Sequence, residues 1–157
     1  RAYIMALKST GYQASALTVV WTSGQSLDSL TDGEWTDVSD AIDNTTNKYT
    51  VVDCELVLGS AAFTGTDSIV SLYIIPSVDG ANYGDWTGNV TTEEKENNAY
   101  YVGSFLTSGA STAQRLPLRD VRIPPGLYKI VLRNTSSVTL AARCNTLKWR
   151  PHSFEDV

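Results

Sequence analysis

Apolar and polar residues alternate along several stretches of the chain with the period of two that is typical of β-strands. The longest such stretch is residues 49–59, where one side carries Val52, Cys54, Leu56 and Leu58. Residues 69–75 are apolar on both sides and rich in β-branched side chains, which predicts a strand covered on both faces. Residues 127–133 alternate again, with one face made of Tyr128, Ile130 and Leu132.

The C-terminal part of the chain predicts a hairpin and a short last strand. A Pro-Pro-Gly turn at 124–126 precedes the strand at 127–133, since proline presets φ and glycine accepts positive φ. The polar cluster 134–137 is typical of a turn, and apolar residues alternate again over 138–142. We therefore expect a hairpin there, followed by a strand around Leu147 and Trp149 that ends at Pro151, which has no N–H to donate.

Shorter strands are expected at 17–22, 35–38, 100–106 and 114–119, and Thr91 or Thr92 can cap one helical turn over 93–97. Eight to nine strands without βαβ alternation predict an all-β, single-domain β-sandwich over residues 1–157, with long polar loops and a jelly roll as the expected topology. Residues 1–15 are expected to form an extended N-terminal arm. The predicted core comprises Leu56, Leu58, Leu72, Ile74, Ile130, Leu132, Leu140 and Trp149.

Composition agrees with a self-sufficient globular domain. The 157 residues are 42% hydrophobic and 18% charged, so the core needs neither a metal nor a disulfide to hold it. No apolar run is long enough to span a membrane, and the first residues lack the apolar region of a secretory signal. The chain begins without Met, so a preceding segment is an open alternative. Cys54 and Cys144 are expected to be free thiols, with Cys54 buried.

Charge is unevenly distributed along the chain, whose net charge is −5. Residues 28–55 hold eight acidic side chains against Lys48 alone, whereas residues 115–150 hold eight basic side chains against Asp120 alone. Either the two blocks pair within the fold, or the basic block docks on an acidic partner. The candidate contact residues for docking are Arg115, Arg119, Arg122 and Arg143. No RNA-recognition motif is present in this acidic chain, so nucleic acid is not an expected partner.

Motifs for catalysis are missing from the sequence. His152 is the single histidine, so a site with two or three histidine ligands in one chain is excluded. We expect His152 to be an exposed residue past the last strand. No nucleophile-elbow, phosphate-loop or dinucleotide-binding pattern occurs, and nothing selects a catalytic pair among the many carboxylates. We expect no enzymatic activity, no cofactor and no metal.

The loop that starts at Asp79 contains residues that can bind calcium or a sugar. Asp79, Asn82 and Asp85 can offer oxygens to calcium, although such residues more often serve turns that need left-handed backbone. Tyr83 and Trp86 can stack on a sugar ring. The favoured interpretation is that these two rings fold back over the edge of the core.

Several strings resemble a family of small structural proteins of tailed bacteriophages. They are NKYTVVDCELVLGSAAFTGTDSIVSLYIIPSVDGANYGDWTGN, AQRLPLRDVRIPPGLYKIVLRN and NTLKWRPHS, and the resemblance covers roughly residues 33–153. Its most specific parts are PSVDG at 76–80, IPPG at 123–126 and NTLKWR at 145–150. The family has no catalytic motif to transfer.

The resemblance implies a jelly-roll capsid decoration (cement) protein, which binds the outer surface of the major capsid protein lattice and stabilises the head. The implied partners are the major capsid protein and further copies of the chain, with a trimer as one arrangement. Membranes are not among them. The implied location is the virion surface, after assembly in the bacterial cytoplasm. The alternatives are a carbohydrate-binding module on a virion and a component of a tail or head-fibre base.

Overall fold

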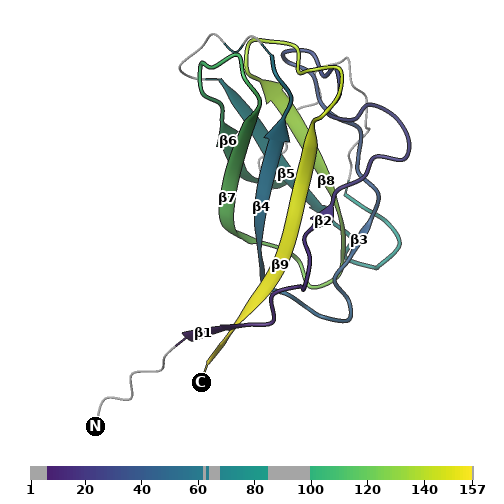
Figure 1. Ribbon diagram of the computed structural model, residues 1–157. Coiled ribbons are helices and arrows are strands. Elements are labelled where there is room, and N and C mark those ends of the chain that lie inside the picture. Colours follow the sequence, from purple (N-terminus) through teal and green to yellow (C-terminus); the bar gives the residue numbers. More distant parts are fainter. Residues whose placement is uncertain (1–6, 62, 64–67, 85–99, 157) are drawn as a thin grey trace.

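The protein folds into a β-sandwich, described here from a computed structural model for residues 7–61, 63, 68–84 and 100–156 (Figure 1). Its strands are all antiparallel, and the pairing divides them between two sheets. The strands are β1 (Leu7–Thr10), β2 (Leu17–Thr18), β3 (Ile42–Asp43), β4 (Val51–Leu58), β5 (Ile69–Pro76), β6 (Tyr101–Leu106), β7 (Gln114–Arg122), β8 (Leu127–Thr135) and β9 (Thr146–Asp156).

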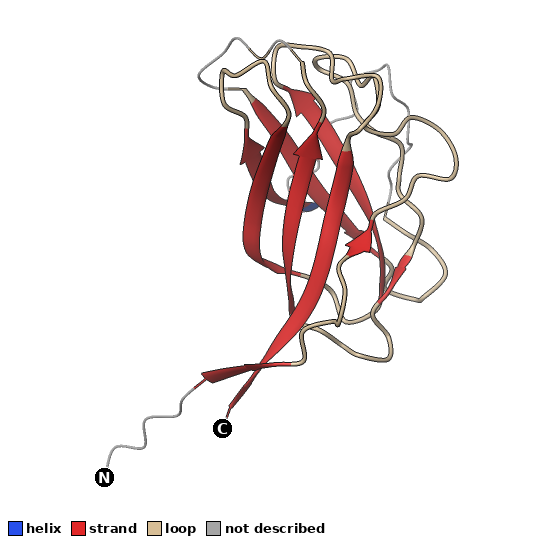
Figure 2. Cartoon of the chain, in the orientation of Figure 1, coloured by secondary structure: helices blue, strands red, loops and turns tan. Residues whose placement is uncertain are grey.

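One sheet has the order β1-β9-β4-β7, with β2 also pairing with β9, and the other has the order β3-β8-β5-β6. The chain passes repeatedly between the sheets, for example from β4 to β5, from β7 to β8 and from β8 to β9. Figure 2 shows the two layers of strands facing each other. The sequence-based prediction of an all-β sandwich is confirmed, and the jelly-roll topology stays a prediction.

The main core lies between the sheets and contains all eight residues that the alternation predicts to be buried. For the seven that lie on strands, this agreement follows from the period of two, because one face of each strand points into the space between the layers. At its centre the Trp149 indole N–H of β9 donates to the Tyr128 hydroxyl of β8 over 2.9 Å. This buried hydrogen bond joins the two sheets directly.

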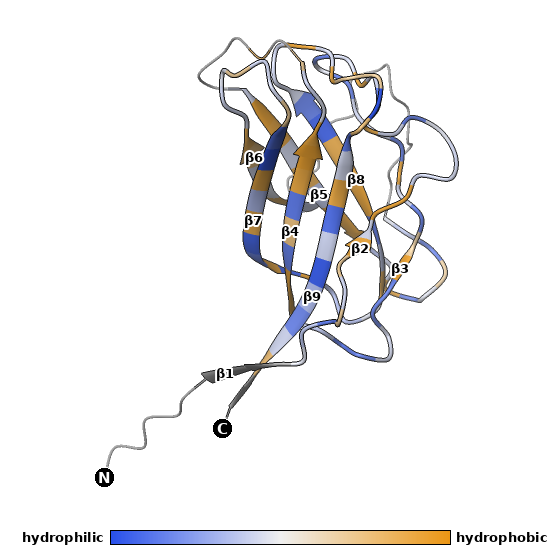
Figure 3. Ribbon diagram, viewed as in Figure 1, coloured by the Kyte–Doolittle hydropathy of each residue, from blue (hydrophilic) through white to orange (hydrophobic). Residues whose placement is uncertain are grey.

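A second apolar cluster covers the outer face of the β3-β8-β5-β6 sheet. It is built from Trp35, Tyr73, Ile75 and Val131, with Val38, Tyr83 and Tyr100 packed against it. The Trp35 and Tyr73 rings lie 5.0 Å apart between centroids. The prediction that β5 is covered on both faces is therefore confirmed. The β1-β9-β4-β7 sheet differs, because charged residues alternate with apolar ones along β4, β7 and β9 (Figure 3).

The predicted hairpin around residues 134–137 is wrong. β8 runs to Thr135, and β9 begins at Thr146 in the other sheet, so the segment between them crosses from one layer to the other. The buried Asn134 organises this crossing: its amide group donates to the Leu30 and Val138 carbonyls at 2.9 and 2.8 Å. Leu140 then packs into the core without belonging to a strand.

The prediction that the last strand ends at Pro151 is also wrong. β9 continues to Asp156, and its distal part pairs with β1 to form a ribbon that leaves the sandwich beside the N-terminal end (Figure 1). The Pro151 carbonyl accepts the Gln13 N–H over 3.1 Å. In an antiparallel strand the nitrogen and carbonyl of one residue face the same side. The Pro151 nitrogen therefore faces the gap between β2 and β1, where its missing N–H breaks no ladder.

Other expectations differ in detail. The strand expected at 17–22 is reduced to β2, and residue 35 forms only an isolated bridge with Arg133. The helical turn expected at 93–97 lies outside the described residues. Cys54 is buried, Cys144 is exposed and both are free, as predicted. Within the described part of the chain, no helix is long and apolar enough to cross a membrane.

Candidate functional site

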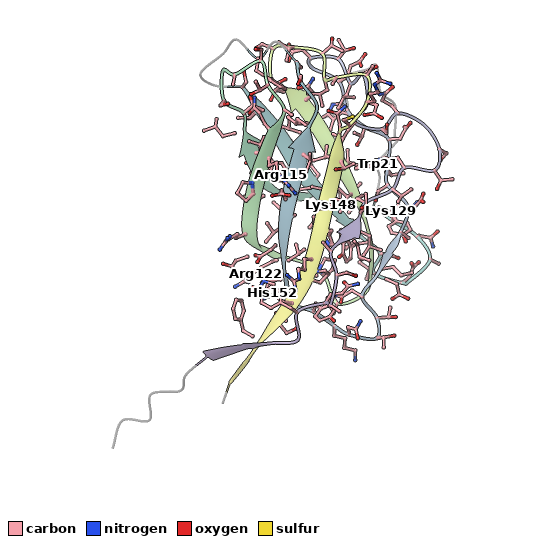
Figure 4. The ribbon with its side chains drawn as sticks, viewed as in Figure 1. Trp21, Arg115, Arg122, Lys129, Lys148 and His152 are labelled. Carbon is pink, nitrogen blue, oxygen red and sulfur yellow. The ribbon has the colours of Figure 1, made fainter. Side chains whose placement is uncertain are left out.

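The outer faces of β7, β4 and β9 bring together parts of the two charge blocks. Because side chains alternate across a strand, β4 places Asp53 and Glu55 on this face. The register sets Asp53 opposite Arg150 of β9, and Glu55 opposite Lys148. On the other side, β7 contributes Arg115 and Arg119. Figure 4 shows Arg115 and Lys148 on either side of β4. An acidic row thus lies between two basic rows.

These side chains line an open depression of about 560 Å³. Its lining contains four cationic residues against two carboxylates, so the local charge is positive although the whole chain is acidic. The cationic side chains are Arg115, Arg119, Lys148 and Arg150. We call this surface, together with the exposed Arg122 at the end of β7, the β7-β4-β9 face.

Three of the four cations are held by neighbours. The Arg115 guanidinium bonds to Glu55 Oε1 through Nη2 at 2.7 Å and through Nε at 3.1 Å. Lys148 Nζ donates to the Thr18 hydroxyl at 2.7 Å. The Arg150 guanidinium lies 4.9 Å from the centre of the Tyr12 ring, and its Nε donates to the Gln13 carbonyl. The Arg115–Glu55 pair is exposed, so it contributes little to stability.

Of the four arginines predicted to make contacts, three share one strand. Arg115, Arg119 and Arg122 are all exposed on β7, whereas Arg143 is exposed in the connection between β8 and β9, beside Gly59. No ion pair to another described residue neutralises Arg119, Arg122 or Arg143. The two charge blocks therefore pair in part, through Arg115 and Glu55. The guanidinium groups of the other three arginines can contact a partner.

His152 is not the exposed residue that the sequence analysis predicted. Its side chain is only 1% exposed, because β9 continues past Pro151 and the rings of Tyr12 and Phe154 cover the imidazole on the outer face of the sheet. The Tyr12 ring stacks on the imidazole with centroids 4.5 Å apart, and Phe154 contacts it edge-on at 5.1 Å. Alternation along β9 puts residues 148, 150 and 152 on one face, a pattern that predicts this placement only for a strand that continues past Pro151.

Two carboxylates face the buried imidazole. His152 Nε2 lies 3.6 Å from Asp53 Oδ1 and 3.8 Å from Asp120 Oδ1. Asp53 comes from β4 and Asp120 from β7, so three neighbouring strands contribute one side chain each. No pattern in the sequence predicts this grouping. We call these three residues the Asp-Asp-His cluster.

A β-bulge places Asp120 in this cluster. The pairing of β4 with β7 shifts between Val52 and Cys54, where Val121 and Leu118 are the respective partners. Asp120 has a φ of 54°, which is uncommon for a residue with a side chain. Its N–H donates to Asp53 Oδ1 at 3.2 Å. Bulges of this kind re-aim a side chain, and no local sequence signal marks this one.

In the described part of the loop after β5, Asp79 holds a turn and Tyr83 packs on the second apolar cluster. Asp79 Oδ1 accepts the N–H groups of Ala81 and Asn82 at 2.9 and 2.7 Å, and these bonds lower the pKa of the Asp79 carboxyl. Its oxygens thus serve a turn, the favoured interpretation. Tyr83 packs on the second apolar cluster beneath Lys129 Nζ, so this ring folds back as expected. Asp85 and Trp86 lie outside the described residues.

Cys54 offers no reactive thiol to the site. Burial, helped by the neighbouring Asp53 charge, raises the pKa of Cys54 to about 12, so the group stays protonated at neutral pH. Its Sγ lies 3.5 Å from the Leu118 carbonyl oxygen on the inner side of the sheet.

Comparisons with known proteins identify no relative. Searches against protein-family models, curated proteins and solved structures all found no match to this chain.

Proposed function

We propose that this chain is a structural virion protein of a tailed bacteriophage, a capsid decoration protein that binds an acidic surface of the major capsid protein. Its β7-β4-β9 face is the proposed contact surface. The observation that carries the proposal is the excess of cationic side chains on this open face of an acidic chain. The resemblance of residues 33–153 to phage structural proteins supports the same role.

The unequal cover of the two sheets favours this face. The outer side of the β3-β8-β5-β6 sheet is occupied by the chain's own Trp35 cluster, whereas the β7-β4-β9 face carries charges toward solvent. Arginine suits such a contact, because its planar fork binds carboxylates through two bonds at once. Complementary charge also selects one orientation of docking and rejects the reversed one.

Charge alone gives weak attachment, since an exposed ion pair contributes about 0–1 kcal/mol. A decoration protein compensates by presenting several copies, which multiplies weak contacts through avidity. We therefore include self-association in the proposal, as a homo-oligomer on the capsid. The role is structural and not enzymatic.

The test uses heads of the encoding phage made without this gene, to which purified protein is added back and measured by co-sedimentation. The Arg119→Ala/Arg122→Ala double variant should bind up to about thirtyfold more weakly, from about 1 kcal/mol per lost pair and about 1.4 kcal/mol per tenfold. Arg143→Ala removes the same kind of charge away from β7 and is the matched control. Binding should also weaken toward 1 M salt, where the Debye length is about 3 Å.

Wild-type affinity of the double variant together with a flat salt series would refute the proposed contact surface. Failure of the wild type to bind heads would refute the decoration role itself. A particle reconstruction that places the chain on a tail or fibre base would move it to that alternative.

A further inference from the structure

The Asp-Asp-His cluster contains a buried imidazole whose hydrogen-bonding capacity is unused. Within the described part of the chain, neither His152 Nδ1 nor Nε2 has a hydrogen-bond partner. The 3.6 and 3.8 Å separations from Nε2 to the Asp53 and Asp120 oxygens exceed the usual 2.7–3.2 Å of an N–H···O bond. Buried polar groups are almost always satisfied, so an unpartnered imidazole aimed at two carboxylates requires an explanation.

The electrostatics of the cluster call for a positive group between the three side chains. Two carboxylates that share one location repel each other, and a neutral imidazole with its lone pair on Nε2 adds to the negative potential there. A cation placed between them removes this repulsion and uses all three ligand atoms at once. We propose that Asp53, Asp120 and His152 bind a divalent metal ion of the zinc type.

The geometry and the kinds of ligand fit such an ion. Nε2 and the two carboxylate oxygens all lie within 4.8 Å of one another. A tetrahedral zinc with bonds of about 2.0–2.2 Å places its ligand atoms about 3.3–3.6 Å apart. The two separations from Nε2 to the carboxylate oxygens, 3.6 and 3.8 Å, are close to this spacing. One imidazole with two carboxylates suits zinc and its neighbours in the first transition row, whereas calcium and magnesium prefer oxygens alone.

The surroundings leave room for a fourth ligand and support the others. The Asp120 side chain is 65% exposed, so water can reach the remaining coordination position. The Tyr12 hydroxyl lies 3.4 Å from Asp53 Oδ2 as a hydrogen-bond donor, and its ring covers the imidazole. Such outer contacts orient metal ligands. The ion would connect β4, β7 and β9 near the point where β9 leaves the sandwich (Figure 4).

This proposal departs from the sequence-based expectation that the chain holds no metal, and it is independent of the proposed capsid contact. One histidine is too few for a typical zinc motif in the sequence. The bulge at Asp120 and the burial of His152 supply what the sequence pattern lacks.

The experiment uses the full chain without a histidine tag and with Cys144→Ser, so that an exposed thiol does not bind the probe. Because His152 is the only histidine, ¹⁵N-histidine labelling gives an NMR spectrum of this imidazole alone. Zinc chloride should shift the Nε2 resonance and saturate at one ion per chain. Magnesium chloride at the same concentration should leave the resonance in place.

Two variants make the assignment specific. Asp120→Asn replaces an anionic ligand by a weaker, neutral amide and keeps a residue type that tolerates positive φ, so it should weaken zinc binding at least about tenfold. Glu55→Gln removes a carboxylate from the same row of β4 and should retain the affinity within about twofold, because it lies outside the cluster.

Equal zinc affinity of the wild type and Asp120→Asn would overturn the proposal. So would an Nε2 resonance in the wild type that does not respond to zinc. Circular dichroism of each variant verifies that the fold is retained.

Discussion

Replacing Tyr128 by phenylalanine removes one oxygen atom from the centre of the molecule and tests the hydrogen bond that joins the two sheets. The Tyr128 and Trp149 side chains are both fully buried, and the Trp149 indole N–H donates to the Tyr128 hydroxyl over 2.9 Å. Tyr128→Phe leaves the ring packing in place but removes the acceptor. The indole N–H is then buried without a partner.

The size of the effect follows from leaving the buried indole N–H without an acceptor. Leaving a buried donor unsatisfied costs about 1–3 kcal/mol, more than the net 0.5–1.5 kcal/mol that an ordinary hydrogen bond contributes. We therefore expect Tyr128→Phe to lower the free energy of unfolding by about 1–3 kcal/mol. Burial also raises the pKa of Tyr128, so its hydroxyl remains a neutral acceptor throughout the physiological range.

The assay is urea unfolding followed by circular dichroism, with the free energy taken from linear extrapolation at constant slope. Tyr101→Phe is the matched control, because the Tyr101 hydroxyl bonds to Ser104 at an exposed site and its loss should change stability by less than about 0.5 kcal/mol.

Trp149→Phe alone and combined with Tyr128→Phe completes a double-mutant cycle. Once the indole is absent, removal of the hydroxyl should cost less than it does in the wild type. Equal costs in both backgrounds, or a Tyr128→Phe effect no larger than that of Tyr101→Phe, would refute the reasoning.

Three further predictions concern the core, the thiols and the crossing segment. Ile130→Ala should destabilise the fold by about 2–5 kcal/mol in the same urea assay, since Ile130 is fully buried between the sheets, and a change below about 0.5 kcal/mol would contradict its placement. At pH 8 a thiol reagent should modify the exposed Cys144 and spare the buried Cys54, whose pKa is raised to about 12. Mass spectrometry should then count one label in the folded chain and two in urea, and rapid double labelling without denaturant would contradict this. Asn134→Ala should lower the free energy of unfolding by about 1–3 kcal/mol, because two loop carbonyls lose their hydrogen-bond donor. Thr139→Ala, at an exposed position nearby, should have little effect, and equal effects of the two variants would show that the Asn134 amide does not organise the crossing.

The sequence by itself determined where the long strands β4, β5 and β8 lie and which of their faces are apolar. The periods of two in residues 49–59 and 127–133 located β4, β8 and their buried faces, because alternation records whether each side chain of a strand meets the core or solvent. Residues 69–75 are apolar on both sides, and this predicted that both faces of β5 are covered. These properties are local, so they can be predicted from the order of residues alone.

The tertiary structure decided which strands are neighbours and what their neighbours bring together. The Asn134 side chain donates hydrogen bonds to two loop carbonyls and holds the segment that crosses between the layers. β8 and β9 therefore lie in different sheets, where the turn cluster predicted a hairpin. Pro151 fits within β9 only because its nitrogen faces a gap between two other strands, and this continuation buries His152. Asp120 meets Asp53 through a bulge set by the pairing of β4 with β7. Pairing between segments far apart in the chain depends on contacts that no local period records, which is why the Asp-Asp-His cluster emerged only from the folded molecule.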